Sequence, residues 1–433
     1  MTYDGAGRVL TRTDAEGNTT SYEYDSLGRV LKTINPDGTV TITEYDLLGN
    51  VVSRTAPHQP DDPDPPTTTV TYDEIDRPVT VTDAAGRIVT SEYHTDFPGR
   101  LTTRKLQASA QDPQQTVYSA TYNTDGRKIS ETRDGVTTQF TYTTDGRPLR
   151  TTYADGTYTE NTYDGRLLLS TRDRSGNVTT FTYDNLGRRT SVTIARSKTT
   201  TTAYLANLRS PASVTDPLGN TTGYTYDSGG RRITTVFPGT DPEFERTQFT
   251  EYDDLGRVTA VHGAKTYPLF YEYDLNGRMT ALIDGEGNRT EWTYDSMGRQ
   301  TLKIYADGTS YQYTYDDEGR LDSRTDAKNQ TTSYAYNAAG NLTTLDYPTD
   351  TDVVSVYDEF GRRTSRTDTA GTWTWTYDGT SQRVLTVTDP DGNVITYTYD
   401  TSGRRTGMTL TVDDIDVMVL TYTYADGRMT AID

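Results

Sequence analysis

Residues 24–45 read YDSLGRVLKTINPDGTVTITEY, and the phrase that opens this stretch, Tyr-Asp-x-x-Gly-Arg, recurs along the whole 433-residue chain. Ten copies are intact, among them those that begin at Tyr3, Tyr24 and Tyr399. Ten more are degenerate, and they are anchored at Tyr45, Tyr72, Tyr93, Tyr122, Tyr142, Tyr163, Tyr204, Tyr336, Tyr377 and Tyr424. Successive anchor tyrosines are mostly 20 to 22 residues apart. A fixed period of this length predicts an array of small supersecondary units rather than a conventional globular core.

Each unit reads as two antiparallel strands with two kinds of turn. Residues 29–34 and 39–45 are rich in strand-forming residues. The segment 35–38, Asn-Pro-Asp-Gly, is a turn signal, because proline presets φ and glycine accepts a positive φ. The anchor phrase supplies the other turn, a three-residue loop with glycine in the left-handed position. Successive turns alternate, so the anchor turns and the opposite turns, which we call far turns, should lie on opposite edges of one long sheet.

The fixed letters of the phrase are our candidate site residues, as structural repeat anchors rather than as a catalytic group. Asp25 and Arg29 should face each other across the loop mouth, and Asp25 should accept hydrogen bonds from turn amides. We expect Gly277→Val to destabilise the protein more than any change at Asn276, whose slot varies between copies. The anchor residues singled out are Tyr24, Asp25, Gly28, Arg29, Tyr183, Asp184, Gly187, Arg188, Tyr273, Asp274, Gly277, Arg278, Tyr294, Asp295, Gly298 and Arg299.

The strand before each anchor alternates with a period of two. The residue two positions before the anchor is often aromatic, as at Tyr22, Phe181 and Trp292, and the residue between is usually threonine or glutamate. One face of the sheet should therefore carry rows of stacked aromatic rings, and the other face should be polar.

Twenty such units predict an all-β protein with roughly 40 strands and almost no α-helix. At about 4.8 Å per strand the sheet would be on the order of 190 Å wide, and twisted open sheets rarely exceed about ten strands without curling. The continuous antiparallel β-hairpin array should coil into a spiral, hollow shell or wide barrel, because so wide a coil cannot be filled by its own side chains. We predict a single array over residues 1–433, truncated at both ends.

Composition limits the classes of function. Only 32% of residues are hydrophobic and 34 residues are tyrosine, which favours a sheet rich in Thr and Tyr over large aliphatic cores. The net charge of −20 opposes nucleic-acid binding, which needs a basic surface. The absence of cysteine excludes disulfides, cysteine-ligated metals and thiol nucleophiles. The sequence has no apolar run long enough to cross a membrane, and we identify no signal peptide.

Catalytic and metal sites are disfavoured by where the reactive residues fall. The histidines His58, His94 and His262 lie in different units, and we expect them at the surface or in turns rather than in a triad or metal site. Most aspartates occupy fixed turn positions, where they cap loops. The run from Asp389 to Asn393 lacks the spacing and terminal glutamate of a calcium loop. We therefore expect no catalytic residue, cofactor or metal.

Four units are longer than the period, with anchor spacings of 27 residues from Tyr45, 29 from Tyr93, 26 from Tyr226 and 25 from Tyr399. The extra residues fall mainly in the far turns, so all four insertions should project from the same edge, where loops do not disturb the strand ladder. They are either tolerated loop drift or a binding surface. Deletion of residues 58–66 should leave folding intact but could alter assembly or partner contact.

The anchors, together with turns such as Asp173–Asn177 and Asp216–Asn220, resemble the repeats of the Rhs/YD-repeat family. That family includes bacterial polymorphic toxins, shell-forming components of insecticidal Tc toxin complexes, bacterial wall-associated proteins and animal teneurins. The resemblance covers nearly the whole chain. It implies a spiral β-sheet that forms a hollow shell, which encloses a C-terminal toxin in toxin members and is an extracellular scaffold in teneurins. The toxin members' core segment after the repeats has no counterpart in this sequence, so self-cleavage and toxicity are carried over to no residue.

Three classes of function follow. The first is a non-catalytic structural shell or scaffold segment, which encloses or displays an associated polypeptide such as a toxin or flanking domains of the same parent chain. The alternative is an extracellular binding module that recognises carbohydrate or a protein partner through aromatic rows and edge loops, and an enzyme is the third. We expect a secreted or cell-surface parent protein, with neither nucleic-acid binding nor membrane insertion.

Overall fold

The computed structural model describes residues 1–206, 209–263, 266–379, 381–425 and 427–433. These residues form 40 β-strands in one sheet and two short 3-10 helices. Every strand pairs in antiparallel orientation with the strand that follows it in the sequence. The protein is therefore all-β, as predicted, and its sheet is one continuous meander.

The strands up to residue 142 are β1 (Thr2–Tyr3), β2 (Val9–Thr13), β3 (Thr19–Tyr24), β4 (Val30–Ile34), β5 (Val40–Tyr45), β6 (Val51–Thr55), β7 (Thr67–Tyr72), β8 (Pro78–Thr82), β9 (Ile88–Tyr93), β10 (Leu101–Gln107), β11 (Gln115–Tyr122), β12 (Lys128–Arg133) and β13 (Val136–Tyr142). Those from residue 148 to residue 294 are β14 (Pro148–Thr152), β15 (Tyr158–Asp164), β16 (Leu167–Arg172), β17 (Val178–Tyr183), β18 (Arg189–Ile194), β19 (Lys198–Tyr204), β20 (Pro211–Thr215), β21 (Thr221–Tyr226), β22 (Arg232–Val236), β23 (Thr247–Tyr252), β24 (Val258–Gly263), β25 (Thr266–Tyr273), β26 (Met279–Asp284) and β27 (Arg289–Tyr294). The remaining strands are β28 (Gln300–Ile304), β29 (Ser310–Tyr315), β30 (Leu321–Thr325), β31 (Thr331–Tyr336), β32 (Leu342–Asp346), β33 (Val353–Tyr357), β34 (Arg363–Asp368), β35 (Gly371–Tyr377), β36 (Val384–Thr388), β37 (Val394–Tyr399), β38 (Arg405–Val412), β39 (Ile415–Ala425) and β40 (Arg428–Ile432). The two 3-10 helices are η1 (Ala195–Ser197) and η2 (Glu243–Arg246).

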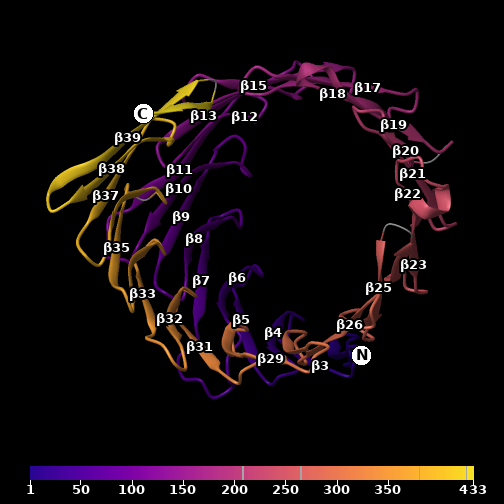
Figure 1. Ribbon diagram of the computed structural model, residues 1–433. Coiled ribbons are helices and arrows are strands. Elements are labelled where there is room, and N and C mark those ends of the chain that lie inside the picture. Colours follow the sequence, from indigo (N-terminus) through magenta and orange to yellow (C-terminus); the bar gives the residue numbers. More distant parts are fainter. Residues whose placement is uncertain (207–208, 264–265, 380, 426) are drawn as a thin grey trace.

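The sheet winds on itself as a spiral ribbon (Figure 1). From the N-terminus the chain runs past β9 and β17 around the ring, and it returns past β25 to lie beside its own beginning. Hydrogen bonds join residues that are 249 to 262 positions apart, which is therefore the length of one pass around the spiral. The loop after β2 meets the loop after β25. A pass of about 23 strands has a diameter on the order of 40 Å, too wide for side chains to fill.

The exposed surface is large for the mass of the protein. The chain exposes 25178 Å² at 48.2 kDa, whereas a compact monomer of that mass exposes about 16,500 Å². Among the described residues, the buried hydrophobic ones are Val40, Ala120, Ala260, Ala281 and Val353. The sheet is thus a single layer without a packed core behind it, and its order depends on the strand ladder and on contacts along its edges.

A β-bulge accompanies each anchor turn in the described part of the chain. Tyr24 pairs with Val30 but Glu23 pairs with Lys32, which leaves Leu31 as an extra residue on β4. The same register shift recurs at the other anchor tyrosines. Bulges bend a strand and increase its twist, so their repetition along one edge curls the sheet.

The bulge also keeps equivalent residues on one face. Tyr22 lies beside Thr33, which in turn lies beside Thr41, whereas the residue equivalent to Tyr22 in the next unit is Thr43. This offset of two residues preserves the face, because side chains alternate with a period of two. Without the bulge the offset would be one, and successive anchors of a 21-residue unit, such as those at residues 24 and 45, would alternate between the faces.

All four insertions lie on the far edge, as predicted. Residues 56–66 join β6 to β7, residues 108–114 join β10 to β11, and residues 237–246 join β22 to β23. The fourth is not a loop: the extra residues lengthen β38 and β39, which meet in a two-residue turn at 413–414. The unit that begins at Tyr93 also has a longer anchor turn, at residues 94–100.

The insertion at residues 56–66 is integrated into the sheet. His58 lies in this far turn, one of the two places expected for the histidines, and it is only 4% exposed. Its backbone N–H and C=O exchange hydrogen bonds of 3.1 and 2.8 Å with Val40, whose side chain is 2% exposed. Deletion of residues 58–66 would remove this bridge and uncover Val40. We therefore now expect that deletion to destabilise the surrounding strands, contrary to the sequence-based expectation.

Candidate functional site: anchor turns and the seam

Each intact anchor turn is a closed ring of hydrogen bonds. At residues 25–29 the Asp25 N–H donates to the Arg29 carbonyl at 2.9 Å, and the Gly28 N–H donates to the Asp25 carbonyl at 3.1 Å. Asp25 Oδ1 accepts from the backbone N–H groups of Leu27 and Arg29 at 2.9 Å, and Arg29 Nε donates to Asp25 Oδ2 at 2.6 Å. Gly28 has φ 84°, the left-handed conformation that favours glycine. This is the turn that the sequence predicts.

In many units a staple then joins the anchor turn to the next unit, and the sequence did not suggest it. Arg29 Nη1 donates to the carbonyl of Asp46 in the next anchor turn at 2.7 Å, and its guanidinium lies 4.6 Å from the centre of the Tyr45 ring. The Tyr45 hydroxyl donates back to the carbonyl of Val30 at 3.0 Å. Aspartate, arginine and the following tyrosine thus form one unit-to-unit staple.

The hydrogen bond from the tyrosine hydroxyl recurs in every unit after the first. The anchor hydroxyl donates to the carbonyl of the residue that pairs with the preceding anchor tyrosine, at distances from 2.6 to 3.0 Å. Each bond satisfies a backbone acceptor beside the bulge. Burial raises the pKa of Tyr273 and Tyr294 above the usual tyrosine value, so these hydroxyls keep their protons at neutral pH.

The other predicted anchor residues occupy the same geometry in separate units. The Arg Nε to Asp Oδ2 distances are 2.6 Å for Arg188–Asp184, 2.5 Å for Arg278–Asp274 and 2.7 Å for Arg299–Asp295. Gly187, Gly277 and Gly298 have φ values of 74°, 84° and 84°. The corresponding tyrosines Tyr183, Tyr273 and Tyr294 make the hydroxyl bonds described above. The anchors do not converge on one site; they form a row along one edge of the sheet.

Far turns with the Asp-x-x-Gly-Asn form close in the same way, and Arg174 links one of them to the preceding far turn at Asp155 and Thr157. In the turn at residues 14–18, Asp14 Oδ1 accepts from the Asn18 N–H at 2.9 Å and Asn18 Nδ2 donates to Asp14 Oδ2 at 3.0 Å. Arg29 reaches the next anchor turn, and so does Asn50, whose Nδ2 donates to Asp76 Oδ1 at 2.8 Å. The arginine that recurs as the last letter of the anchor phrase was the sequence signal that could have revealed the staple.

The expected stacking of aromatic rings on one another is wrong. Among the described residues no aromatic contact joins two anchor tyrosines. Cations lie over the rings instead: Arg278 is 4.8 Å from the Tyr294 ring centre, Arg363 is 4.6 Å from Trp375, and Arg405 is 3.9 Å from Tyr397. Alternation of arginine and aromatic rings replaces ring-on-ring stacking.

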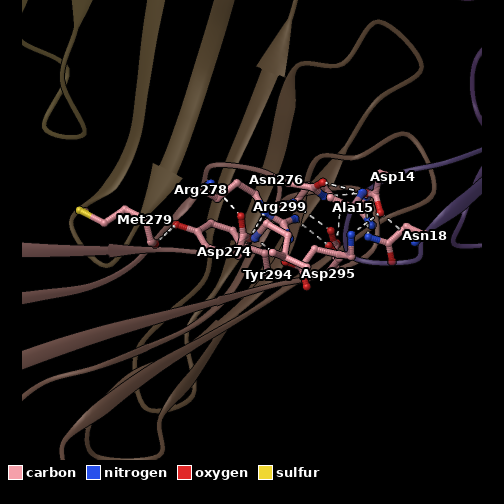
Figure 2. A network of polar contacts seen from close by, with 12 residues as sticks. Asp14, Ala15, Asn18, Asp274, Asn276, Arg278, Met279, Tyr294, Asp295 and Arg299 are labelled. Atoms are coloured by element: carbon pink, nitrogen blue, oxygen red, sulfur yellow. Dashed lines mark hydrogen bonds and ion pairs between the residues drawn. The ribbon is translucent and has the colours of Figure 1, made fainter. Parts of the chain in front are cut away.

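The two passes of the spiral meet along a line that we call the seam, where anchor turns of the second pass contact far turns of the first. Figure 2 shows one such contact. Asn276 Nδ2 donates to Asp14 Oδ2 at 2.6 Å, and the Ala15 N–H donates to Asn276 Oδ1 at 3.1 Å (Figure 2). The Leu275 N–H donates to Glu16 Oε1 at 2.7 Å. Asn276 is therefore not a neutral slot, and it is a poor reference for tests of Gly277.

Ion pairs continue the seam along the spiral. Asp155 Oδ2 lies 2.7 Å from Arg174 Nη2 in its own pass and 2.5 Å from Arg404 Nη1 in the other. Its side chain is 7% exposed, so the carboxylate is shielded from solvent. Arg299 reaches Asp37 at 3.4 Å and Gln59 Nε2 donates to Asp317 at 2.7 Å. A cavity of about 720 Å³ opens in the seam beside the insertion, between Ala56 and Pro66 on one side and residues 336–340 on the other.

The seam carboxylates are held in their ionised form. The Asn18 amide, with Asn276 adding to it against the cost of burial, lowers the pKa of Asp14 from 3.8 to about 2. Burial opposes ionisation of Asp155, but hydrogen bonds from Thr157 and the charges of Arg174 and Arg404 outweigh it, and the pKa is below its usual value. Both carboxylates are thus charged at neutral pH.

The seam should be lost only in acid. Because both folded-state pKa values are lowered, the carboxylates contribute fully above the unfolded value of 3.8, and their contribution disappears as pH falls through the folded value. We expect the radius of gyration from small-angle scattering to be constant from neutral pH to about pH 4 and to rise towards about pH 2 as the passes separate. An increase already near neutral pH would contradict this assignment.

Removal of the Asp155 carboxylate should separate the passes locally. Asp155→Ala leaves Arg174 and Arg404 without their shared partner, so hydrogen exchange should accelerate in the turn at residues 400–404. The matched control is Asp145→Ala, which removes a more exposed carboxylate paired with Arg147 in an anchor turn of the first pass. Equal exchange at residues 400–404 in both variants would show that Asp155 does not hold the seam.

The histidines and acidic residues form no common centre. His58 Nδ1 lies 2.8 Å from the Ala56 carbonyl, His94 contacts Phe97 and Tyr122, and His262 Nε2 lies 2.9 Å from Glu251. Across the described ranges, no three His, Asp or Glu side chains are grouped to hold a metal ion. No helix within these ranges has the length and apolar character needed to span a membrane.

Two family models match this sequence. The model described as RHS Repeat matches residues 3–40, 163–199, 204–242 and 377–413, and the model described as Teneurin YD-shell matches residues 245–365. No curated protein matches the chain.

Solved structures of Tc toxin components share the fold. A structure of the Photorhabdus luminescens Tc holotoxin pore has a TM-score of 0.61 and 16% identity, and the match covers 95% of this chain and 26% of that chain. The crystal structure of TcdB2-TccC3-Cdc42 has a TM-score of 0.61 and 15% identity, and the match covers 96% of this chain and 27% of that one. At such identities the likeness concerns the fold, and this chain spans about a quarter of the length of those chains.

Proposed function

Because the chain belongs to the Rhs/YD-repeat family, we propose that it is a non-catalytic wall segment of a protein shell, which encloses or displays an associated polypeptide. On this proposal residues 1–433 act as one array, and the Tyr, Asp, Gly and Arg of each phrase serve as its structural anchors. The enclosed polypeptide would be a toxin or another segment of the parent chain. We place that parent protein outside the cell or at its surface.

The observation that carries the proposal is the wound single layer. The sheet exposes 25178 Å², against about 16,500 Å² for a compact protein of its mass. Its residues therefore form an extended wall rather than a packed core. The staples and the seam both act to keep the wall coiled. The interactions that we identify among the described residues therefore serve to hold the wall together. Two neighbours in fold are components of a toxin complex, which fits a polypeptide cargo.

The binding-module alternative is weakened by the cations over the rings. A sugar stacks on a free aromatic face, but Arg278, Arg363 and Arg405 occupy faces of Tyr294, Trp375 and Tyr397. No geometry in the described residues favours carbohydrate binding over enclosure.

A protease-protection experiment tests enclosure. A flexible polypeptide with one protease site is fused after residue 433, and its cleavage rate is compared with that of the free polypeptide. Enclosure predicts cleavage slowed by at least about tenfold, because the site is reached only through local opening. The control is the same fusion carrying Asp155→Ala, which should restore part of the rate by opening the seam. Cleavage at the free rate in the unaltered fusion would refute enclosure by this chain.

A further inference from the structure

Asn276 is the one asparagine in the sequence that directly precedes a glycine. It occupies the slot before the glycine of the anchor phrase, where other units have residues such as Leu27, Leu186 and Met297. A side-chain amide in this position is open to attack by the backbone nitrogen that follows it, because glycine has no Cβ to hinder a close approach. The sequence thus places a reactive amide in a single anchor turn of the array.

The structure places this amide in the seam, among acidic side chains (Figure 2). Asn276 Nδ2 donates to Asp14 Oδ2 at 2.6 Å, and Asn276 Oδ1 accepts from the Ala15 N–H at 3.1 Å. Glu16 Oε1 accepts from the backbone N–H of the neighbouring Leu275 at 2.7 Å. The contact with Asp14 therefore requires the N–H of an amide, which a carboxylate in its place would lack.

A new carboxylate in this contact would be poorly compensated. Asp14 is charged at neutral pH, because hydrogen bonds from amide groups lower its pKa from 3.8 to about 2. The arginines of the two adjacent anchor turns are already paired, Arg278 with Asp274 at 2.5 Å and Arg299 with Asp295 at 2.7 Å. Two carboxylates would thus face each other at the seam, where like charges repel.

We propose that Asn276 is a site of deamidation, and that the products of this reaction hold the seam open. The Gly277 nitrogen forms a bond to Asn276 Cγ, the bond between Cγ and the amide nitrogen breaks, and ammonia leaves with the proton of the Gly277 N–H. Water then opens the succinimide ring and gives aspartate or isoaspartate. The net change is hydrolysis of an amide to a carboxylate and ammonium, with no oxidation or reduction.

The closed seam protects Asn276 from this reaction. The Gly277 N–H donates to the Asp274 carbonyl at 3.0 Å, so the attacking nitrogen is held in the turn. Both polar atoms of the Asn276 amide are bonded across the seam, to Asp14 and Ala15. Attack therefore requires that the turn open and the amide rotate. Each local opening exposes the amide to reaction, and the reaction then prevents closure, so a reversible opening becomes permanent.

Both products are incompatible with the closed contact. Aspartate loses the donor to Asp14 and adds a like charge at hydrogen-bond distance. Isoaspartate adds a methylene group to the backbone, which lengthens the ring that the Gly277 N–H closes with the Asp274 carbonyl. Either change should let the anchor turn at residues 274–278 separate from the far turn at residues 14–18. This inference does not depend on enclosure of a polypeptide.

Peptide mapping by mass spectrometry of the whole chain, held at neutral pH and sampled over time, tests the reaction. Asn276 should gain the mass of an amide replaced by a carboxyl before any other asparagine does. Its rate should be at least about tenfold slower than in a synthetic peptide of residues 272–280, because reaction needs local opening. Asp14→Ala removes the seam acceptor and should bring the rate towards that of the peptide.

The matched control for that rate is Asp216→Ala, which removes the corresponding aspartate from another Asp-x-x-Gly-Asn turn and should leave the rate at Asn276 unchanged. The proposal is overturned if Asn276 stays intact in the whole chain while the peptide converts. It is equally overturned if chain and peptide convert at the same rate, since the seam would then give no protection.

Hydrogen exchange measures what the product does to the seam. Asn276→Asp should accelerate exchange in residues 14–18 by at least about tenfold, and Asn276→Ser, which removes the amide without adding charge, should accelerate it less. Leu186→Asp places the same carboxylate in the same slot of an anchor turn outside the seam contacts, and exchange in residues 14–18 should stay as in the unaltered chain. Equal exchange in Asn276→Asp and the unaltered chain would refute the opening of the seam by the product.

Discussion

Replacement of Gly187 by valine is expected to destabilise its part of the array by about 2 kcal/mol or more, because a β-branched residue is strained at positive φ. Gly187 has φ 74°, and an added Cβ would meet nothing closer than Leu167 Cδ2 at 3.8 Å, so the cost is in the backbone rather than in a clash. The measurement is native-state hydrogen exchange in β17 and β18, the strands that this turn connects.

The matched control introduces the same side chain two positions earlier. Asn185→Val changes an exposed residue of the same turn that does not have a positive φ, and it should alter the exchange of β17 and β18 by far less. This turn lies in the first pass and outside the seam contacts, unlike the turn of Gly277, where Asn276 bonds to Asp14. Equal protection in Gly187→Val and in the unaltered protein would contradict the left-handed assignment.

The second large effect is expected at Arg362, the most buried arginine of a staple. Arg362→Ala should destabilise the surrounding units by about 3–5 kcal/mol, the usual loss when one partner of a buried charged group is removed. Arg362 is 8% exposed; it donates to the Gly379 and Ser381 carbonyls at 2.6 and 2.7 Å and pairs with Asp358 at 2.7 Å. The variant leaves those acceptors unsatisfied and uncovers the Tyr377 ring, whose centre is 4.6 Å away.

Urea titration followed by the intrinsic fluorescence of the protein should show an earlier transition for Arg362→Ala, since Trp373 and Trp375 lie in the adjacent β35. Arg12→Ala, which removes an exposed arginine from β2, serves as the control and should shift the transition little. Arg362→Lys should rescue only part of the loss, because an ammonium cannot donate to Asp358 and to two carbonyls in the planar geometry of a guanidinium. Full rescue by lysine would show that charge alone matters at this position.

The local parts of this fold were readable from sequence because each depends on residues close together in the chain. The ring of Asp25, Gly28 and Arg29 spans five positions, and its composition specifies its geometry. The far-edge position of the insertions followed from the alternation of turns. The coiling also followed, since no flat sheet of this width is stable.

The missed parts connect residues that the sequence does not bring together. The reach of Arg29 to Asp46 and Tyr45 spans a whole unit, and it requires knowing that anchors of successive units are neighbours on one face. The seam spans 249 to 262 residues, and its register depends on the curvature of the sheet, which no local pattern encodes. For the same reason Asn276 looked freely variable, and the sequence did not indicate the pairing of His58 with Val40.

The bulge at each anchor has a consequence for how such genes can change. A far turn can gain residues, as at 56–66 and 237–246, while the units on both sides keep their lateral offset. A single residue lost from a strand, as at Leu31, would instead shift all later side chains to the opposite face. One such deletion would therefore reverse the face on which every later side chain lies. A second deletion of the same kind in a later unit would return the side chains after it to their original face, much as a second frameshift restores a reading frame. In the units between the two deletions, the anchor tyrosines would lie on the face that threonine occupies in the original protein.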